Sequence, residues 1–261
     1  DPESVNETIT KKTKAIMPIH YGGCPCKIRE LKEIADDNNL ILIEDAAESL
    51  GTTYKGKMSG TFGKVGIYSF NGNKIITTSG GGMVVCDDNN LIKKIRFWAT
   101  QSREKERYYQ HKELGYNYRM SNICAAIGRG QLTVINDRIE KKKEIYEMYK
   151  EGFQDIDDLY MMNICDYGQP NYWLSVVLIK PDSKVKPLDM IVALENENIE
   201  SRPIWKPMQL QPFFMKYDFV SQLDEGSVSE DLFKRGLCLP SDTKMTKEEQ
   251  QKVIDIIKGL F

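Results

Sequence analysis

Histidine is scarce in this sequence: only His20 and His111 occur among its 261 residues. Neither stands at the spacing from cysteine that zinc sites use, so we expect no metal site. An excess of basic residues is also missing, since 36 lysines and arginines face 38 acidic residues and the net charge is −2. We therefore expect no nucleic-acid partner. No apolar run is long enough to cross a membrane, so no membrane partner is expected either.

Close cysteine pairs are equally rare. The six cysteines are scattered, and Cys24-Pro-Cys26 is the single pair of near neighbours. A chain of this length can build a core without disulfides, so reduced thiols and a cytoplasmic location are expected. The partners we expect are small molecules and further subunits.

The apolar pattern predicts an α/β protein with a largely parallel sheet. Short apolar runs alternate with stretches of helical periodicity in the first half of the chain, as in layered α/β folds. The predicted strands cover residues 15–20, 40–44, 65–70 and 82–86, and the predicted helices cover 28–38 and 91–99.

A long helix is predicted to join two domains. Residues 121–153 carry an apolar stripe followed by the charged run 138–143, which should face water. We expect a large domain over residues 1–153 and a smaller C-terminal α/β domain over residues 154–261. In the smaller domain, strand 172–179, helix 188–198, a proline-rich loop 204–214 and helix 246–257 are predicted. Thr246 and Glu249 have the spacing of a capping box at the start of the last helix.

Acidic residues follow the apolar run that ends at Ile43. Glu44 and Asp45 come next, and small residues lead on to Glu48. Ligands of open α/β sheets bind at the carboxyl ends of strands, which places Asp45 well to meet a protonated ring. The alternative is structural, because Asp at a helix start with Glu three residues later is also a capping box.

A loop rich in glycine, asparagine and hydroxyls surrounds one lysine. Residues 69–82 read SFNGNKIITTSGGG, with the lysine at position 74. Glycine allows close approach of the backbone, and hydroxyls with free N–H groups suit a phosphate. The order of residues is not that of a Walker A loop. The alternative is a surface turn with a solvated lysine.

Together, the two segments match the needs of pyridoxal phosphate. This cofactor requires a lysine amine for its Schiff base, an acid on its pyridine nitrogen and donors around its phosphate. The chain resembles the DegT/DnrJ/EryC/StrS sugar aminotransferases, which have the fold type I architecture, over essentially its whole length. The resemblance rests on EDAAESLG at 44–51, GTFG at 60–63, SFNGNK at 69–74, TSGGG at 78–82 and GYNYRMS at 115–121.

The resemblance implies a role for several residues. Lys74 would form the Schiff base and move the proton, and Asp45 would pair with the pyridine nitrogen. Ala47 would pack near the cofactor face, and Glu48 would lie beside the ring and the substrate. Ser69 would bind the phosphate.

The resemblance also implies a homodimer with shared active sites. Asn117 would reach the phosphate in the neighbouring subunit. Related dehydratases carry histidine in place of the lysine, so Lys74 favours transamination. Glutamate would donate the amino group, and a nucleotide-linked keto sugar would accept it.

Within the family, the chain is similar to enzymes that aminate C4 of a UDP-linked sugar, UDP-2-acetamido-4-keto-2,4,6-trideoxyhexose. Glu48, NGNKIITT at 71–78 and RPIWKPM at 202–208 are typical of this group, whereas Gln209 stands where histidine is expected. The side chains of Arg202, Trp205 and Lys206 are candidates for holding the substrate. A tryptophan flanked by prolines can instead be a packed anchor.

Other interpretations stay open. The acceptor could be a C3 keto sugar or a GDP- or dTDP-linked one, and the chain could be a non-catalytic binding or assembly subunit. Family members extend upstream of the position of Asp1, so we expect an N-terminal part to be lacking, including a turn that holds the phosphate. His20, at the end of a predicted strand, is expected to be structural.

Overall fold

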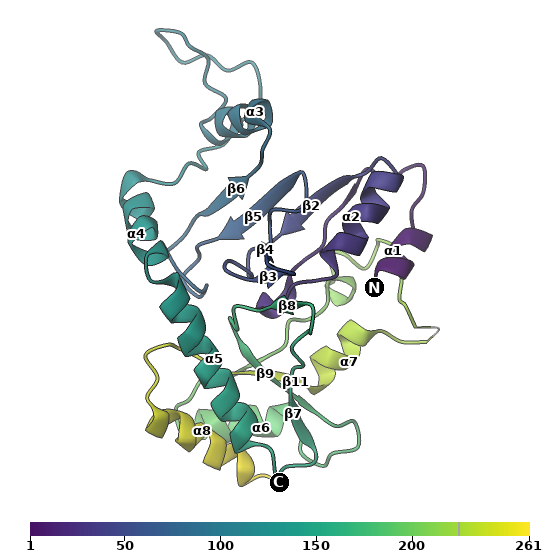
Figure 1. Ribbon diagram of the computed structural model, residues 1–261, viewed down its shortest axis with the longest axis vertical. Coiled ribbons are helices and arrows are strands. Elements are labelled where there is room, and N and C mark those ends of the chain that lie inside the picture. The colour runs from purple at the N-terminus through teal and green to yellow at the C-terminus, as the bar shows by residue number, and fades with distance from the viewer. Residues whose placement is uncertain (224) are drawn as a thin grey trace. The chain divides into compact units, whose positions relative to one another are not determined.

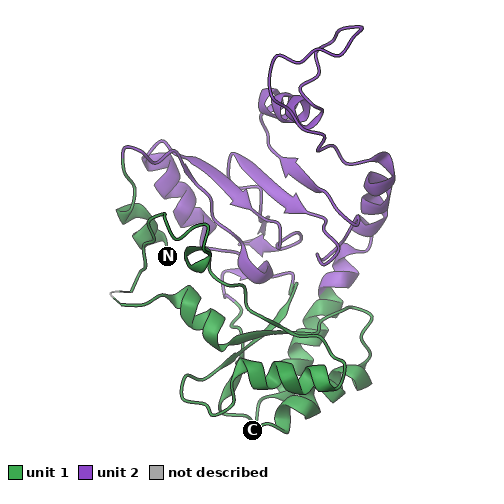
Figure 2. Ribbon diagram, turned by 180° about the vertical axis from the view of Figure 1, so that it is seen from behind, with its two compact units in different colours: residues 1–10, 140–164, 172–261 green, residues 11–139, 165–171 purple. Residues whose placement is uncertain are grey.

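The computed structural model describes residues 1–223 and 225–261, which form two compact units. Unit 1 contains residues 1–10, 140–164 and 172–261, and unit 2 contains residues 11–139 and 165–171 (Figure 2). This division differs from the two contiguous domains expected from the sequence. The short segment 165–171 folds with the first half of the chain, and the N-terminal helix α1 (Pro2–Glu7) belongs to unit 1.

A four-stranded sheet organises unit 2, with the strand order β1-β2-β5-β6 (Figure 1). These strands are β1 (Ala15–Ile16), β2 (Ile41–Asp45), β5 (Val65–Ser69) and β6 (Gly82–Val85). β1, β2 and β5 are parallel, and β6 is antiparallel to β5. The predicted α/β fold with a mostly parallel sheet is confirmed. β1 is shorter than the predicted strand 15–20, although Ile19 still pairs with Asp45 as an isolated bridge.

Two helices of unit 2 lie where the apolar periodicity predicted them. α2 (Ile28–Asp37) buries Ile28, Leu31 and Ala35 and contacts β1 and β2. α3 (Asn89–Ala99) begins after Asp88, whose side chain accepts the N–H groups of its first turn. A second small sheet joins β3 (Thr53–Tyr54), β4 (Lys57–Met58) and β8 (Gly168–Gln169), so the segment 165–171 is tied to unit 2 by backbone pairing.

The prediction of one long helix over residues 121–153 is wrong in one respect, because the helix is interrupted. α4 (Asn122–Leu132) ends at Thr133, and α5 (Ile135–Gly152) starts after Val134. The Thr133 hydroxyl and the Thr133 N–H both donate to the carbonyl of Gly130, at 2.7 and 3.3 Å. A hydroxyl that bonds back to the preceding turn competes with the helical ladder, and two consecutive β-branched residues weaken it further.

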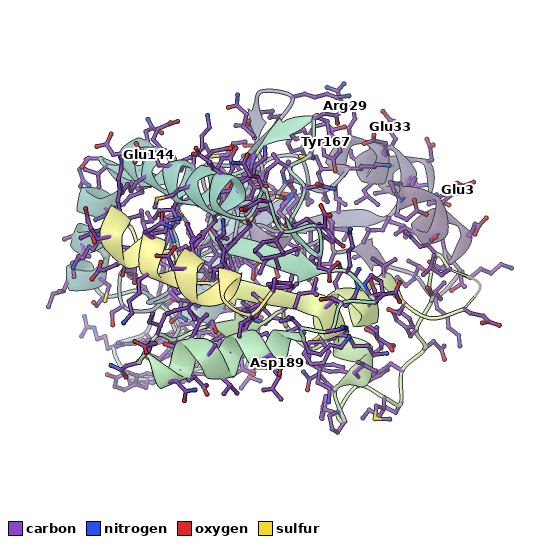
Figure 3. The ribbon with its side chains drawn as sticks, turned by 90° about the horizontal axis from the view of Figure 1, so that it is seen from below. Glu3, Arg29, Glu33, Glu144, Tyr167 and Asp189 are labelled. Carbon is purple, nitrogen blue, oxygen red and sulfur yellow. The ribbon has the colours of Figure 1, made fainter. Side chains whose placement is uncertain are left out.

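Unit 1 has an antiparallel sheet in the order β10-β11-β9-β7. Its strands are β7 (Leu159–Met161), β9 (Ser175–Ile179), β10 (Arg202–Pro203) and β11 (Gly236–Leu239). The helices α6 (Pro187–Asn196) and α8 (Lys247–Lys258) pack against each other, and α7 (Val228–Arg235) contacts β9. Figure 3 marks Glu144 on α5 and Asp189 on α6, where Asp189 accepts the backbone N–H of Lys186 at 2.8 Å. The predicted capping box of Thr246 and Glu249 is present.

One lysine of the run 138–143 does not face water as expected. The Lys142 ammonium is partly buried and donates to the carbonyls of Trp173 and Ser241, at 3.0 and 2.5 Å. Lys142 therefore links α5 to two other segments of unit 1. Among the residues that the structure describes, no helix combines the length and the apolar character needed to cross a membrane.

Candidate active site

The carboxyl end of β2 brings two acids to different environments. Burial alternates along the strand, with Leu42 and Glu44 buried and Ile43 and Asp45 partly exposed, as the two faces of a strand require. The Asp45 carboxylate accepts the N–H of Ala47 at 3.0 Å, so it stays at the end of the strand beside the next turn.

Glu44 is fully buried and forms the anchor of this edge of the sheet. Its two carboxylate oxygens accept the backbone N–H groups of Gly60, Phe62 and Gly63 at 2.5–2.7 Å, and the ring of His20 at 3.0 Å. Burial opposes ionisation, but the hydrogen bonds from His20 and from the loop amides outweigh it and lower the pKa of Glu44. A charged, fully bonded carboxylate thus lies one residue before Asp45.

The loop between β5 and β6 holds Lys74 in a defined position. The N–H groups of Thr78 and Phe70 donate to the carbonyls of Phe70 and Gly81, each at 3.0 Å, which closes the loop at its base. The two residues that follow the lysine, Ile75 and Ile76, are buried in the core of unit 2. The alternative of a solvated surface turn is wrong, because this packing keeps the Lys74 side chain largely covered.

Lys74 and Glu48 face each other in this covered region. The Lys74 Nζ atom lies 3.8 Å from Oε1 of Glu48, and the two side chains are only 13% and 15% exposed. Burial lowers the pKa of the Lys74 amine, and the carboxylates of Glu48 and Asp45 offset this shift only in part. Burial also raises the pKa of Glu48. Such paired shifts of an amine and an acid are typical of functional sites.

Two residues that the sequence patterns did not single out hold Glu48. The N–H of Gly22 donates to Oε2 of Glu48 at 2.7 Å, from a turn in which Gly22 has a φ of 64°. The side-chain amide of Asn171 donates to the backbone carbonyl of Glu48 at 2.8 Å. Glu44 was also missed as an anchor, although its shared face with Leu42 was a signal for its burial.

The remaining cofactor candidates lie in unit 2 as well. Ser69 is the last residue of β5, opposite Gly82 of β6, and its hydroxyl accepts the N–H of Asn71 at 3.3 Å. Asn117 is exposed and pairs with Thr100 as an isolated bridge. Its predicted role in a neighbouring subunit stays a prediction.

The three substrate candidates lie in unit 1. The Arg202 guanidinium pairs with Glu200, and Lys206 is exposed. Trp205 is 45% exposed, and its ring centre lies 5.7 Å from that of Trp173. The packed-anchor alternative for Trp205 thus holds for one side of the ring, and the contact of these residues with substrate stays a prediction.

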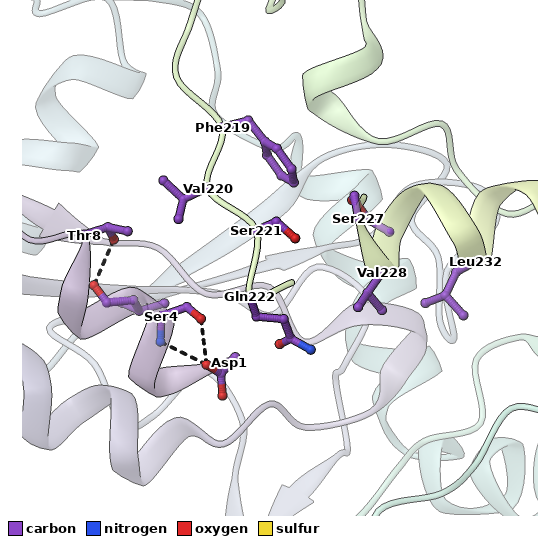
Figure 4. A pocket seen from close by; sticks show the side chains of 12 residues that line it. Asp1, Ser4, Thr8, Phe219, Val220, Ser221, Gln222, Ser227, Val228 and Leu232 are labelled. Atoms are coloured by element: carbon purple, nitrogen blue, oxygen red, sulfur yellow. Dashed lines mark hydrogen bonds between the residues drawn. The ribbon is translucent and has the colours of Figure 1, made fainter. Parts of the chain in front are cut away.

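A separate hollow of about 400 Å³ occurs within unit 1 (Figure 4). α1 contributes one wall, and residues 219–222 and α7 with its preceding cap contribute the others. Ser4, Thr8, Ser227, Val228 and Leu232 are among the residues that line it. None of the sequence-predicted site residues takes part in this hollow.

The residues around Lys74 fit pyridoxal phosphate. This group requires a reactive amine, an acid for its ring nitrogen and donors for its phosphate. Unit 2 supplies a covered lysine, the Asp45 carboxylate and the Ser69 hydroxyl.

Comparisons with known proteins identify relatives of this chain. A sequence profile of the DegT/DnrJ/EryC1/StrS aminotransferase family matches residues 1–258. EpsN of Bacillus subtilis, whose name describes a pyridoxal phosphate-dependent aminotransferase, is 49% identical over 248 residues, which are 95% of this chain and 63% of EpsN. The GDP-perosamine synthase of Escherichia coli O157:H7 is 37% identical over 257 residues, 98% of this chain and 68% of that protein.

A solved structure is similar over the whole of this chain. The crystal structure of a DegT DnrJ EryC1 StrS aminotransferase from Brucella abortus is 26% identical and has a TM-score of 0.87, covering 100% of this chain and 69% of that one. The chain thus spans about two thirds of the length of these relatives, and just 63% of EpsN. The profile match over nearly every residue means that this chain belongs to the DegT/DnrJ/EryC1/StrS aminotransferase family.

Proposed function

We propose that this protein transfers an amino group from glutamate to a nucleotide-linked keto sugar, with pyridoxal phosphate as its cofactor. The observation that carries the proposal is the covered Lys74 amine, 3.8 Å from Glu48 and electrostatically coupled to Asp45, in a chain that matches the family over residues 1–258. A buried amine beside two carboxylates at the carboxyl edge of a sheet is suited to covalent and proton-transfer chemistry.

Three side chains would hold the cofactor. Lys74 would bind its aldehyde carbon through the amine, Asp45 would keep a proton on its ring nitrogen, and Ser69 would donate to its phosphate. Ala47, beside Asp45, would pack against its face. When bound, pyridoxal phosphate supplies an electron sink for the carbon that loses a proton.

Lys74 would also move protons while its amine is free. Because burial lowers the pKa of the Lys74 amine, a larger share of the amine is neutral and can accept a proton from the α-carbon of glutamate. The same amine can return a proton to the keto carbon of the sugar in the second half of the reaction. Glu48 keeps a negative charge close to the protonated form.

We propose C4 of UDP-2-acetamido-4-keto-2,4,6-trideoxyhexose as the acceptor carbon. Glu48, the stretch 71–78 and the stretch 202–208 are typical of enzymes with this substrate, and Arg202 and Lys206 would supply cations for its diphosphate. Gln209 departs from that pattern; its amide donates to the hydroxyls of Ser227 and Ser229 at 3.2 and 3.0 Å.

A GDP-linked 4-keto sugar is the second candidate. The observation in its favour is the 37% identity to a GDP-perosamine synthase, whose name states a GDP-linked product. Both substrates share a diphosphate and a 4-keto carbon, so the nucleotide base is what separates them.

The active form is proposed to be a cytoplasmic homodimer in which Asn117 completes the site of the other subunit. Support comes from exposed apolar side chains near Asn117 in the sequence. Leu114 and Ile123 are each 76% exposed, and the exposed rings of Tyr116 and Tyr118 stack at 4.8 Å. Exposed apolar side chains that gather on one surface mark interaction sites, which would suit a dimer contact here.

Reduction with borohydride in the presence of pyridoxal phosphate tests the cofactor site. We expect a pyridoxyl adduct on Lys74 by peptide mass spectrometry, lost in Lys74→Ala and kept in Lys64→Ala, which alters an exposed lysine of the same unit. Labels scattered over surface lysines in the wild-type protein would contradict the proposal.

The acceptor is then identified with ¹⁵N-glutamate and a panel of UDP-, GDP- and dTDP-linked 3-keto and 4-keto sugars. Transfer of ¹⁵N to the UDP-linked 4-keto sugar is the expected result. Preference for the GDP-linked sugar would favour the second candidate. An adduct on Lys74 without transfer to any sugar would favour a non-catalytic binding subunit.

A further inference from the structure

A short segment from the second half of the chain reaches into unit 2. In residues 165–171, β8 pairs with β3, and the carbonyl of Tyr167 accepts the N–H of Lys55 at 3.0 Å. The segment ends at Asn171, which is fully buried. The buried Asn171 side chain therefore lies against the turn that carries Glu48, although the two residues are far apart in the sequence.

The Asn171 side chain clamps that turn. Its amide Nδ2 donates to the carbonyl of Glu48 at 2.8 Å and to the carbonyl of Leu50 at 3.0 Å. The backbone N–H of Asn171 donates to Oγ1 of Thr52 at 3.0 Å, and that hydroxyl donates to the carbonyl of Gly23 at 2.6 Å. The two donors of one amide therefore fix two carbonyls of the Glu48 turn.

The opposite side of Glu48 is fixed by the neighbouring turn. Gly22 donates to Oε2 of Glu48 at 2.7 Å, which directs this oxygen toward residues 21–23. The other oxygen, Oε1, faces Lys74 at 3.8 Å. Since Asn171 and Thr52 also link to residue 23, both the backbone and the carboxylate of Glu48 are held within one hydrogen-bonded network.

We infer that Asn171 is a positioning residue, which holds the Glu48 turn so that the Glu48 carboxylate stays opposite Lys74. The inference deepens the proposed function and rests on it for the role of Lys74. The geometry of the clamp itself does not depend on the cofactor or on the sugar.

Loss of these hydrogen bonds should change the pKa of Lys74 in a definite direction. Asn171→Ala would leave two buried carbonyls without these donors, and the turn would relax to find others. The Lys74 amine is faced by two carboxylates, Glu48 and Asp45, which raise its pKa against the effect of burial. A displaced Glu48 removes one of them while burial remains, so the pKa of Lys74 should fall further.

The experiment measures the acetylation of Lys74 by an N-hydroxysuccinimide ester as a function of pH, followed by peptide mass spectrometry, in protein without pyridoxal phosphate. We expect Asn171→Ala and Glu48→Gln each to move the labelling midpoint of Lys74 down by about one pH unit. In the double variant, Asn171→Ala should add nothing to Glu48→Gln, because its effect passes through the carboxylate.

A matched control separates positioning from general loss of stability. Gln250 is likewise buried, and its amide donates to the carbonyl of Ile145 at 2.7 Å in unit 1. Gln250→Ala should lower the melting temperature to a similar degree without moving the Lys74 midpoint. Asn171→Leu, which keeps about the same side-chain size without charge and without the donors, should act as Asn171→Ala does and serves if the alanine variant does not fold.

Three results would overturn the inference: an unchanged midpoint in a folded Asn171 variant, a midpoint that rises toward that of exposed lysines, or additive shifts in the double variant. These results are independent of the proposed function, because no cofactor is present. Failure of borohydride labelling at Lys74 would reject the cofactor site and leave the Asn171 clamp standing.

Discussion

The Nε2 atom of His20 lies 3.0 Å from Oε2 of Glu44, and both side chains are fully excluded from solvent. The same carboxylate also closes the loop at residues 60–63 through three backbone N–H groups. Asp45 follows directly in the chain, and its N–H and carbonyl bond to Pro18 and His20 at 2.9 and 3.1 Å. Asp45, the proposed partner of the cofactor ring, is thus held in place by its bonds to residues 18 and 20 and by its chain neighbour, the buried Glu44.

Replacement of Glu44 by glutamine should strongly destabilise unit 2. A glutamine amide would direct donors at a site already surrounded by N–H groups, and each buried donor left without an acceptor costs about 1–3 kcal/mol. We expect the free energy of unfolding in urea to fall by at least about 2 kcal/mol. Glu33→Gln, an exposed change on α2, is the control and should leave it within about 0.5 kcal/mol of wild type. Equal stability of the two variants would contradict the anchoring role of Glu44.

Glu44 should also make the protein sensitive to acid. Its pKa is lower in the folded than in the unfolded state, so it binds a proton more readily when the chain unfolds. Its contribution to stability is therefore complete above the ordinary carboxyl pKa of about 4.3 and is lost as the pH falls below this value through the folded pKa. Urea unfolding from pH 6 to pH 3 should show a steeper loss in wild type than in Glu44→Gln, because exposed acids titrate alike in both. Parallel curves of unfolding free energy against pH for the two proteins would contradict this role of Glu44.

Regular elements could be predicted because their signals are local. The helix at residues 28–37 and the strand at 41–45 follow from apolar spacing, and the capping box of Thr246 follows from two residues three apart. Asp45 and Lys74 stood out because a strand end and a glycine-rich loop mark ligand sites in such folds.

The rest depends on contacts between distant residues. Asn171 binds the turn at residues 48–50, more than a hundred positions earlier, and no pattern near Asn171 marks this. Lys142 has the sequence surroundings of an exposed helix face, yet its ammonium donates hydrogen bonds to two carbonyls from other segments. The break between α4 and α5 rests on a hydroxyl that bonds back to Gly130, a local contact that the apolar stripe conceals.

Substitution of two glycines tests how tightly the loop bound by Glu44 is packed. Gly60 and Gly56 both have a φ of 82°, where any side chain is strained by roughly 1–2 kcal/mol. A Cβ at Gly60 would lie 2.6 Å from the Tyr68 hydroxyl, whereas one at Gly56 would meet nothing within 4 Å. Gly60→Ala should therefore destabilise the protein more than Gly56→Ala, by about 1–3 kcal/mol for the added clash. Differential scanning calorimetry of the two variants measures this, and equal melting temperatures would contradict it.

Mixed dimers test whether two subunits share each active site. Lys74→Ala removes the proposed Schiff-base lysine, and Asn117→Ala removes the residue proposed to reach the partner's cofactor phosphate, so each variant alone should be inactive or nearly so. A heterodimer of the two would carry one intact site, in which Lys74 comes from one subunit and Asn117 from the other. After unfolding and refolding of equal amounts together, random pairing should restore about a quarter of the wild-type activity, because a quarter of all sites are intact. Activity that stays at the level of the separate variants, in a mixture shown by mass spectrometry to contain heterodimers, would mean that Asn117 serves its own subunit.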